Sequence, residues 1–249
     1  MARSKTKYTK YAVLRREPSL HPALPETLPL ALANMSRLLG KYSKVVAKPS
    51  TGSRGAGVIM VSSQGHNRYS VHYGRVRHTC KGLNRTYTHV RSKVKRSYIV
   101  QRGISLATVN GRPFDIRVMV QRRIGGNWVI TGMLAKVAGP GYIVTNIGRS
   151  KGKVLPLRTA IRLSSACRLS QAAIIRRIRS VALRAARRLA TYYTSQRVFG
   201  LDMGIDSSGR VWIIEANLTP DITLFLKMRD KRIYRTILAY RRQNRNRKR

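Results

Sequence analysis

The sequence of 249 residues predicts an α+β protein, and three stretches carry this expectation. Residues 115–122 and 128–137 are alternating or apolar runs on either side of a Gly-Gly-Asn turn, which predicts a long hairpin. Residues 200–205 and 210–218 are β-rich runs joined by Asp-Ser-Ser-Gly, a turn-forming sequence that predicts a second antiparallel hairpin. Between them, apolar positions recur at helical spacing over residues 170–193, which indicates one long amphipathic helix.

The elements before the first hairpin are shorter. Residues 1–41 are basic and interrupted by prolines, so we expect an extended connector that leads into a short helix over residues 30–39. Two β-rich segments over residues 43–48 and 57–62 flank a glycine-rich stretch, which predicts a strand, a loop and a strand. Residues 72–96 are basic and suit either a helix or a disordered flap.

Three further segments complete the secondary-structure prediction. Residues 98–100 are typical of the end of a strand, and residues 142–147 suit a third strand beside the first hairpin. The C-terminal end is strongly basic, with six basic residues among residues 241–249 and no apolar anchor. We therefore expect a mobile basic tail there.

The charge of the chain is extreme, since 51 Lys and Arg residues face eight acidic ones and the formal net charge is +43. Counterions or a polyanionic partner must relieve the resulting self-repulsion. Nucleic acid, an acidic polymer and an anionic membrane surface all fit this charge, and so does a merely solvated surface. No zinc-finger, helix-turn-helix or RNA-recognition signature is present. A membrane-surface protein would need a Trp- or Phe-rich amphipathic face, which the sequence lacks.

The two cysteines, Cys80 and Cys167, belong to no CxxC motif and have no histidine at metal spacing near them. Neither a disulfide framework nor a zinc site is therefore indicated, and both cysteines suit a reducing compartment. The N-terminus lacks the apolar core of a secretory signal, and no stretch approaches ~18 apolar residues. We expect a soluble or peripheral protein of the cytoplasm.

Acidic residues are rare and unevenly placed, because five of the eight lie between positions 202 and 230. The second hairpin brings Asp202 across from the neighbourhood of Ile214 and Glu215, and Asn217, two residues beyond Glu215, faces the same side of its strand. Carboxylate and amide oxygens are hard ligands that suit Mg²⁺, which usually takes one or two carboxylates and completes its shell with waters and phosphates. The alternative is that these acids pair with the abundant arginines.

A second candidate site is the glycine-rich stretch over residues 49–57, directly after Lys48. Successive backbone amides in such a stretch can surround phosphates while a lysine supplies charge. It is not a Walker A motif, because GxxxxGK[ST] is absent and a β-like run follows instead of a helix. Alone, the stretch is equally typical of an ordinary turn.

Five stretches in this order resemble the ATP-grasp superfamily and, more narrowly, its endospore coat-associated YheC/YheD branch. They are KPSTGSRGAGV, YIVQRGISL, GRPFDIRVMVQ, KVAGPGYIVTNI and GLDMGIDSSGRVWIIEANLTPD, and the resemblance spans about residues 41–221. It implies an α+β fold of two lobes, each with an antiparallel sheet, that enclose a nucleotide cleft. The implied ligands are ATP and Mg²⁺.

The resemblance also implies roles for individual residues. Lys48 would hold the ATP phosphates, and the loop around Ser53, Gly55 and Gly57 would close over them. The adenine and ribose would lie along the interlobe segment formed by Gln101, Arg102, Gly103 and Ile104. Catalysis would involve Arg117, facing the transferred phosphoryl group, and Lys136, which stands where this branch usually has Arg and would help to bind the acid substrate. The metal ligands would be Asp202, Glu215 and Asn217.

The implied organisation has four parts. Residues 1–41 form the connector, residues 42–100 the small lobe with the glycine-rich flap, residues 101–238 the large lobe with the metal site, and residues 239–249 the basic tail. The implied activity is that of a Mg·ATP-dependent carboxylate–amine or carboxylate–thiol ligase that acts through an acylphosphate. An acidic or polyanionic substrate would suit the positive charge.

A second function fits the same sequence. An ATP-grasp scaffold could serve, without catalysis, as a basic protein that binds a polyanion, either nucleic acid or an acidic polymer, or that associates with the spore coat. Phosphate-backbone contacts would then dominate, and affinity would fall steeply with salt. Nucleotide binding that depends on Mg²⁺ distinguishes the first function, and nucleotide-independent binding of polyanions the second.

Overall fold

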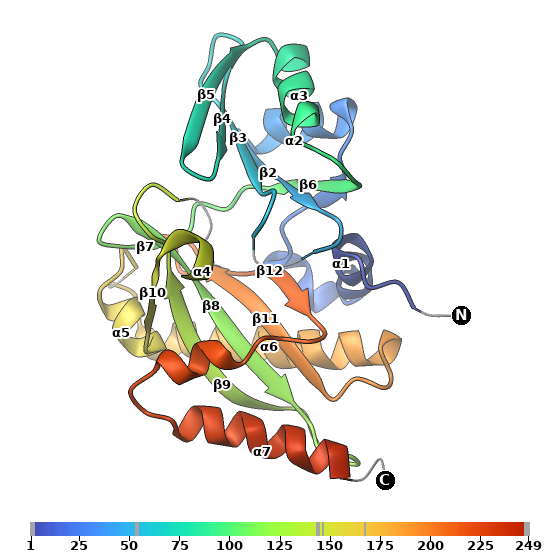
Figure 1. The fold of residues 1–249 in the computed structure, drawn as a ribbon, viewed down its shortest axis with the longest axis vertical. Coiled ribbons are helices and arrows are strands. Elements are labelled where there is room, and N and C mark those ends of the chain that lie inside the picture. Colours follow the sequence, from blue (N-terminus) through green and yellow to red (C-terminus); the bar gives the residue numbers. More distant parts are fainter. Residues whose placement is uncertain (1–2, 53–54, 143–144, 146, 167, 247–249) are drawn as a thin grey trace.

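A computed structural model describes residues 3–52, 55–142, 145, 147–166 and 168–246. Two antiparallel sheets lie one above the other, each in its own lobe (Figure 1). The mixed architecture with two antiparallel sheets confirms the predicted α+β fold. No helix of the described residues is long and apolar enough to cross a membrane.

The small lobe is a six-stranded sheet in the order β1-β6-β2-β3-β4-β5. Helix α2 packs on it through Met35 and Leu38, both fully buried against Val45 and Val61. The predicted strands near residues 43–48, 57–62 and 98–100 are β2, β3 and β6. The elements of this lobe are β1 (Thr27–Pro29), α2 (Leu32–Tyr42), β2 (Lys44–Pro49), β3 (Ile59–Ser63), β4 (Arg68–Tyr73), β5 (Val76–Lys81), α3 (Leu83–Ser92) and β6 (Tyr98–Arg102).

The large lobe is built on a sheet in the order β10-β9-β8-β11-β12, with β7 paired to β8. Its elements are β7 (Thr108–Val109), β8 (Arg112–Gln121), β9 (Val129–Val137), α4 (Ile147–Ser150), β10 (Lys153–Leu155), α5 (Leu157–Arg162), α6 (Gln171–Tyr192), β11 (Val198–Ile205), β12 (Val211–Asn217), the 3₁₀ helix η2 (Thr223–Lys227) and α7 (Arg232–Asn246). Helices α5 and α6 cover one face of this sheet, and η2 and α7 cover part of the other.

The long helix and both hairpins are confirmed. Ser170 caps α6 by accepting a hydrogen bond from the Ala173 backbone at 3.3 Å, and the apolar side of the helix is buried on the sheet. In the β11–β12 turn, the Asp206 carboxylate accepts bonds from the Ser208 and Arg210 backbones at 3.1 and 3.0 Å. Gly209 has φ +75°, and a Cβ there would lie 2.6 Å from a Leu169 methyl group. The turn therefore requires glycine at this position.

The N-terminal connector is a correction. Residues 7–15 form helix α1 (Lys7–Arg15), and residues 18–23 form the 3₁₀ helix η1 (Pro18–Ala23). Val13 and Leu20 are buried in the large-lobe core, whereas β1 joins the small sheet beside β6. The prolines restrict the chain only from position 18 onward, so a capped nine-residue helix fits before them. The segment joins both lobes instead of leading up to one.

The C-terminal tail is a second correction. Residues 239–246 continue helix α7, and residues 247–249 lie outside the described part of the chain. Ile237 anchors the helix, since its side chain is fully buried with Phe225 and Leu134. The basic composition of residues 241–249 predicted a tail, but the apolar residues one and two turns earlier hold the helix on the sheet.

Two other predicted segments differ from the structure. Residues 72–96 contain the end of β4, strand β5 and helix α3, so the expected helix is present beside a hairpin rather than a flap. Of the expected strand over residues 142–147, three positions lie outside the described residues. Tyr142 and Thr145 belong to no strand, and Ile147 begins the short helix α4.

The anchoring of α7 can be tested with Ile237→Ala. Removing this fully buried side chain leaves a cavity between the helix and the sheet, and we expect the free energy of unfolding to fall by about 2–5 kcal/mol. Urea denaturation measures the change, with Gln243→Ala on the exposed side of the same helix as the control. Equal stability of the two variants would show that α7 is not part of the folded core.

Candidate active site in the cleft between the lobes

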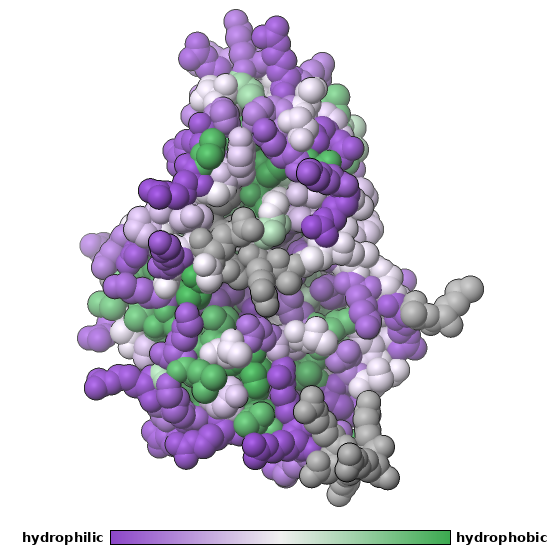
Figure 2. Space-filling model, viewed as in Figure 1, coloured by the Kyte–Doolittle hydropathy of each residue, from purple (hydrophilic) through white to green (hydrophobic). Residues whose placement is uncertain are grey.

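A cleft with a volume of about 610 Å³ lies between the two sheets. The small lobe contributes residues of β2, β3 and β6 to its walls, and the large lobe contributes residues of β8, β9, β11 and β12. In the space-filling view, hydrophilic and hydrophobic side chains both border the junction of the lobes on this side of the molecule (Figure 2). The cleft therefore lies where the resemblance implied a nucleotide site.

The cleft brings together most of the predicted site residues. Gly57 and Gly103 do not line it. A Cβ on Gly57 would overlap the Tyr98 hydroxyl at 2.3 Å, and one on Gly103 would overlap the Lys44 side chain at 2.5 Å, so both glycines allow close packing. Ser53 lies outside the described residues. The predicted residues on the walls are Lys48, Gly55, Gln101, Arg102, Ile104, Arg117, Lys136, Asp202, Glu215 and Asn217.

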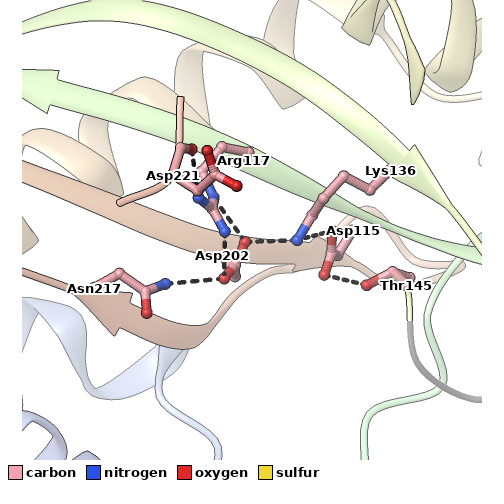
Figure 3. Close-up of polar contacts among 7 residues, drawn as sticks. All are labelled: Asp115, Arg117, Lys136, Thr145, Asp202, Asn217 and Asp221. Atoms are coloured by element: carbon pink, nitrogen blue, oxygen red, sulfur yellow. Dashed lines mark hydrogen bonds and ion pairs between the residues drawn. The ribbon is translucent and has the colours of Figure 1, made fainter. Parts of the chain in front are cut away.

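Asp202 is the centre of a buried ion-pair network on the large-lobe wall (Figure 3). Arg117 binds it with two nitrogens, Nε to Oδ1 at 3.0 Å and Nη2 to Oδ2 at 3.1 Å. The Lys136 ammonium donates to Oδ1 at 2.7 Å, and the Asn217 amide donates to Oδ2 at 3.0 Å. Strand register causes this convergence, because Asp202 lies opposite Arg117 in the β8–β11 ladder. Four polar side chains are thus fixed in place.

The network continues to Asp115, which lies opposite Lys136 in the β8–β9 ladder. Lys136 is 3.0 Å from Asp115 Oδ1, and the Thr145 hydroxyl donates to the other carboxylate oxygen. Asp115 and Arg117 are two residues apart and share one face of β8. Lys136 therefore lies between two carboxylates at the floor of the cleft.

Burial and charge set the pKa values of this network. Burial alone would raise the pKa of Asp202, but the Arg117 and Lys136 charges hold it well below its ordinary range. The pKa of Asp115 is raised, because burial outweighs the attraction of Lys136. Burial would lower the pKa of Lys136, yet the two carboxylates raise it. Within this network Asp202 therefore keeps its negative charge, and Lys136 stays protonated.

Lys48 on β2 lies on the opposite wall. Its ammonium group donates to the Gln101 Oε1 atom at 2.6 Å, and the Gln101 amide donates to the Thr27 hydroxyl at 2.8 Å. Burial lowers the pKa of Lys48 to about 8. This lysine is held against the small sheet by neutral partners, so its charge is available to an anion in the cleft.

The three predicted metal ligands lie on adjacent positions of the β11–β12 hairpin. Asp202 pairs with Glu215 in the ladder, and Asn217 is two residues further along β12. The described residues contain no cluster of three or more His, Cys, Asp or Glu side chains, but Mg²⁺ needs only one or two carboxylates. Two carboxylates and an amide oxygen beside a cleft fit that requirement. A metal on Asp202 would have to replace one of its present hydrogen bonds.

One residue that lines the cleft was missed because the N-terminal segment was expected to be a connector. Lys7 on α1 lines the cleft, donates to the Gly52 carbonyl at 2.8 Å and lies 3.3 Å from Glu215 Oε1. Thr6 is the residue of the sequence that could have indicated this helix, because its side chain caps α1 by accepting a hydrogen bond from the Thr9 backbone at 3.1 Å. A helix start at Thr6 would have placed a lysine in its first turn.

Each lobe contains an antiparallel sheet, and the two lobes enclose a cleft with a lysine on one wall and an acidic hairpin on the other. This arrangement is that of an ATP-grasp protein. The family model for YheC/D-like ATP-grasp proteins matches residues 2–242. The chain belongs to this family, as the sequence motifs predicted.

The chain is similar to two curated proteins of Bacillus subtilis strain 168. It is 26% identical over 234 residues to the endospore coat-associated protein YheD, covering 88% of this chain and 49% of YheD. It is 23% identical over 223 residues to the endospore coat-associated protein YheC, covering 86% of this chain and 59% of YheC. The chain therefore spans about half the length of these relatives.

The fold is also similar to that of a solved structure, the ATP-grasp ligase PsnB in complex with a phosphomimetic variant of its minimal precursor, Mg and ADP. The TM-score is 0.55 at 14% identity, over 96% of this chain and 58% of PsnB. At this identity the likeness shows the shared fold.

The ion-pair network can be tested by comparing Asp202→Asn with Asp115→Asn. We expect Asp202→Asn to lower the free energy of unfolding by about 3–5 kcal/mol, because it leaves buried Arg117 and Lys136 short of a counter-charge. Asp115→Asn should cost clearly less, since burial already disfavours the charged form of Asp115. Chemical denaturation at pH 7 measures both. If Asp115→Asn loses more stability than Asp202→Asn, then Asp115 and not Asp202 is the central carboxylate of the network.

Proposed function

We propose that this protein is a Mg·ATP-dependent ligase that joins a carboxylate to an amine or a thiol. The observation that carries the proposal is the placement of Lys48 on one wall of the cleft and of Asp202, Glu215 and Asn217 on the other. Phosphates carry negative charge, and the first wall offers a cation to them while the second offers oxygen ligands to a metal. Family membership supports nucleotide use, and PsnB, which shares the fold, is named as an ATP-grasp ligase with Mg and ADP.

In this proposal ATP supplies the phosphoryl group that activates the substrate carboxylate as an acylphosphate. Lys48 holds the phosphate chain, and the flap around Gly55 covers it. Asp202, Glu215 and Asn217 hold Mg²⁺. The adenine and ribose lie along the interlobe segment, which consists of Gln101, Arg102, Gly103 and Ile104. Such a site works by fixing charges and positions before the reaction, and it needs no protein nucleophile.

Arg117 and Lys136 are proposed to bind the transferred phosphoryl group and the acid substrate. Both reach the floor of the cleft, but both are already bound to Asp202. The third guanidinium nitrogen of Arg117 donates to the Asp221 carbonyl at 3.3 Å. An anionic substrate therefore meets two cations whose positions Asp202 has fixed, which favours binding of a carboxylate in one orientation.

A metal-binding role of Glu215 predicts that Glu215→Gln lowers the affinity for ATP in Mg²⁺ at least tenfold and removes the difference between Mg²⁺ and EDTA. The amide is a neutral and weaker ligand for a hard cation. Calorimetric titration measures both affinities, and Glu17→Gln, which removes a solvent-exposed carboxylate, is the control.

The ligase reaction itself is tested by release of ADP and phosphate with candidate carboxylates and an amine or thiol. Absence of release with every acid and acceptor would favour a binding protein.

A second candidate function is binding of a polyanion, either nucleic acid or an acidic polymer. The specific observation is helix α6, where five exposed arginines form no ion pair within 4.0 Å to any residue that the structure describes. Rows of exposed arginine that form no ion pair suit phosphate contacts, which need no sequence recognition. The five arginines are Arg176, Arg177, Arg179, Arg184 and Arg187.

Association with the spore coat is supported only by the names of the two relatives, and a cytoplasmic location stays an expectation from the sequence.

Binding of a polyanion to α6 predicts an affinity for duplex DNA that falls with salt, with a log–log slope of about 0.9 for each phosphate that the protein neutralises. Changing Arg176, Arg177, Arg184 and Arg187 to glutamine should reduce this slope. The matched control removes the same charge from the small lobe, by changing Arg68, Arg77, Arg85 and Arg91 to glutamine. Fluorescence anisotropy at salt concentrations from about 50 to 300 mM measures the slopes, and equal slopes for both variants would show that α6 is no special surface.

A further inference from the structure

The chain crosses from the small lobe to the large lobe within a few residues after β6. The Gly103 backbone N–H donates to the Lys44 carbonyl in the small lobe at 2.8 Å, and the Ala107 backbone N–H donates to the Ile205 carbonyl in the large lobe at 2.8 Å. The crossing is thus made by residues 104–106. Short segments of this kind absorb the change in backbone angles when two lobes move, so side-chain contacts beside the crossing restrain the angle between the lobes.

The Arg102 side chain joins the two lobes beside this crossing. Its guanidinium carbon lies 4.5 Å from the centre of the Tyr42 ring, at the end of α2, and 4.6 Å from the centre of the Trp212 ring on β12. A guanidinium group is planar and stacks on aromatic faces. It forms no ion pair within 4.0 Å to any residue that the structure describes, which leaves the two rings as its main partners.

Both rings are held in place within their own lobes. The Tyr42 hydroxyl donates to the Glu26 carboxylate at 2.8 Å, and the Trp212 indole N–H donates to the Asp206 carboxylate at 2.9 Å. Trp212 is also buried, and Arg210 lies over its ring with 4.1 Å between the guanidinium carbon and the ring centre. Because each ring is fixed in its lobe, a guanidinium group that contacts both rings resists a change in the interlobe angle.

These contacts lie next to the part of the cleft where the base and ribose are proposed to bind. Arg102 and Ile104 line the cleft from the interlobe segment, and Ile214 lines it from β12. Ile213 belongs to the large-lobe core, so its neighbours Trp212 and Ile214 face the other side of the sheet. A change in the distance between Arg102 and Trp212 would therefore widen or narrow the space between Ile104 and Ile214.

Resting on the proposed nucleotide site, we propose that Arg102 is a positioning residue whose guanidinium group joins Tyr42 to Trp212 and holds the lobes at the angle that fits the base and ribose. The side chain acts through the two lobes and not through the phosphates. Without it the lobes adopt other angles as well. The apparent affinity then falls with the fraction of molecules that keep the fitting angle.

The proposal is tested with Arg102→Met and Arg102→Lys. Methionine removes the charge and the planar group, whereas lysine keeps the charge but offers no flat face to the rings. The matched controls are Arg85→Met and Arg85→Lys, at an exposed position of α3. Calorimetric titrations with ATP, ADP, AMP and adenosine in Mg²⁺ give the affinities. We expect both Arg102 variants to bind all four ligands about 5- to 30-fold more weakly, as for loss of a largely desolvated cation–π contact.

Variants of the rings test the contact itself. Tyr42→Phe keeps the ring and should retain most of the affinity, whereas Tyr42→Leu should weaken the binding of all four ligands. Combining Tyr42→Leu with Arg102→Met should cost less than the product of the two single losses, because both changes remove the same contact. Trp128→Phe leaves Trp212 as the only tryptophan, and its emission without nucleotide should change with Arg102→Met and not with Arg85→Met.

Three results would overturn the inference. They are equal affinities of Arg102→Met and Arg85→Met, a loss that grows with the number of phosphates, which would make Arg102 a direct phosphate ligand, and an emission of Trp212 that Arg102→Met leaves unchanged. If the unaltered protein binds none of the four ligands, the proposed function and this inference fall together. Thermal unfolding confirms that each variant is folded, and the Tyr42 variants carry the test if Arg102→Met does not fold.

Discussion

The buried carboxylate of Asp202 on β11 joins four strands of the large sheet, since its partners Arg117, Lys136 and Asn217 come from β8, β9 and β12. Taking charges out of water is costly, and the cost is offset only when each charge has well-placed partners. Asp202 meets that condition with both of its oxygens engaged. The same contacts position two cations at the floor of the cleft, so the interaction that stabilises this wall also prepares it for an anionic ligand.

The two faces of the large sheet have different surroundings, since one carries the main core and the other borders the cleft. On β8, Ile116 and Val118 point to the face covered by α6, whereas Asp115 and Arg117 point to the cleft. The cleft face is itself divided, because η2 and α7 cover it around Met119 and Leu134. Only the part nearest the small lobe stays open. The N-terminal segment then joins the lobes, with Leu20 in one core and β1 in the other sheet, and this connection sets the geometry of the cleft.

The few acidic residues of this strongly basic chain lie in distinct positions of the structure. Asp115, Asp202 and Glu215 line the cleft, while Asp206 forms a turn and Glu26 pairs with Arg37 and Lys41 in the small lobe. The cleft thus concentrates negative charge on one wall, and cations from α1 and β2 stand beside it. This arrangement suits a ligand that itself carries both a metal cation and phosphates.

The sequence by itself determined the α+β class, the family, the two hairpins and the long helix, because these depend on local periodicity, turn chemistry and ordered motifs. It also placed Asp202 across from the neighbourhood of Ile214 and Glu215, since a short turn limits the register of its hairpin. The register shift between Asp202 and Met203, which the structure shows, sets the pairing with Glu215. The tertiary structure alone decided that Asp202 binds Arg117 and Lys136, that α7 packs on the sheet, and that Lys7 reaches the cleft. These contacts join residues 66 to 208 positions apart in the chain, and no local pattern specifies which distant partner a charged or apolar side chain will meet.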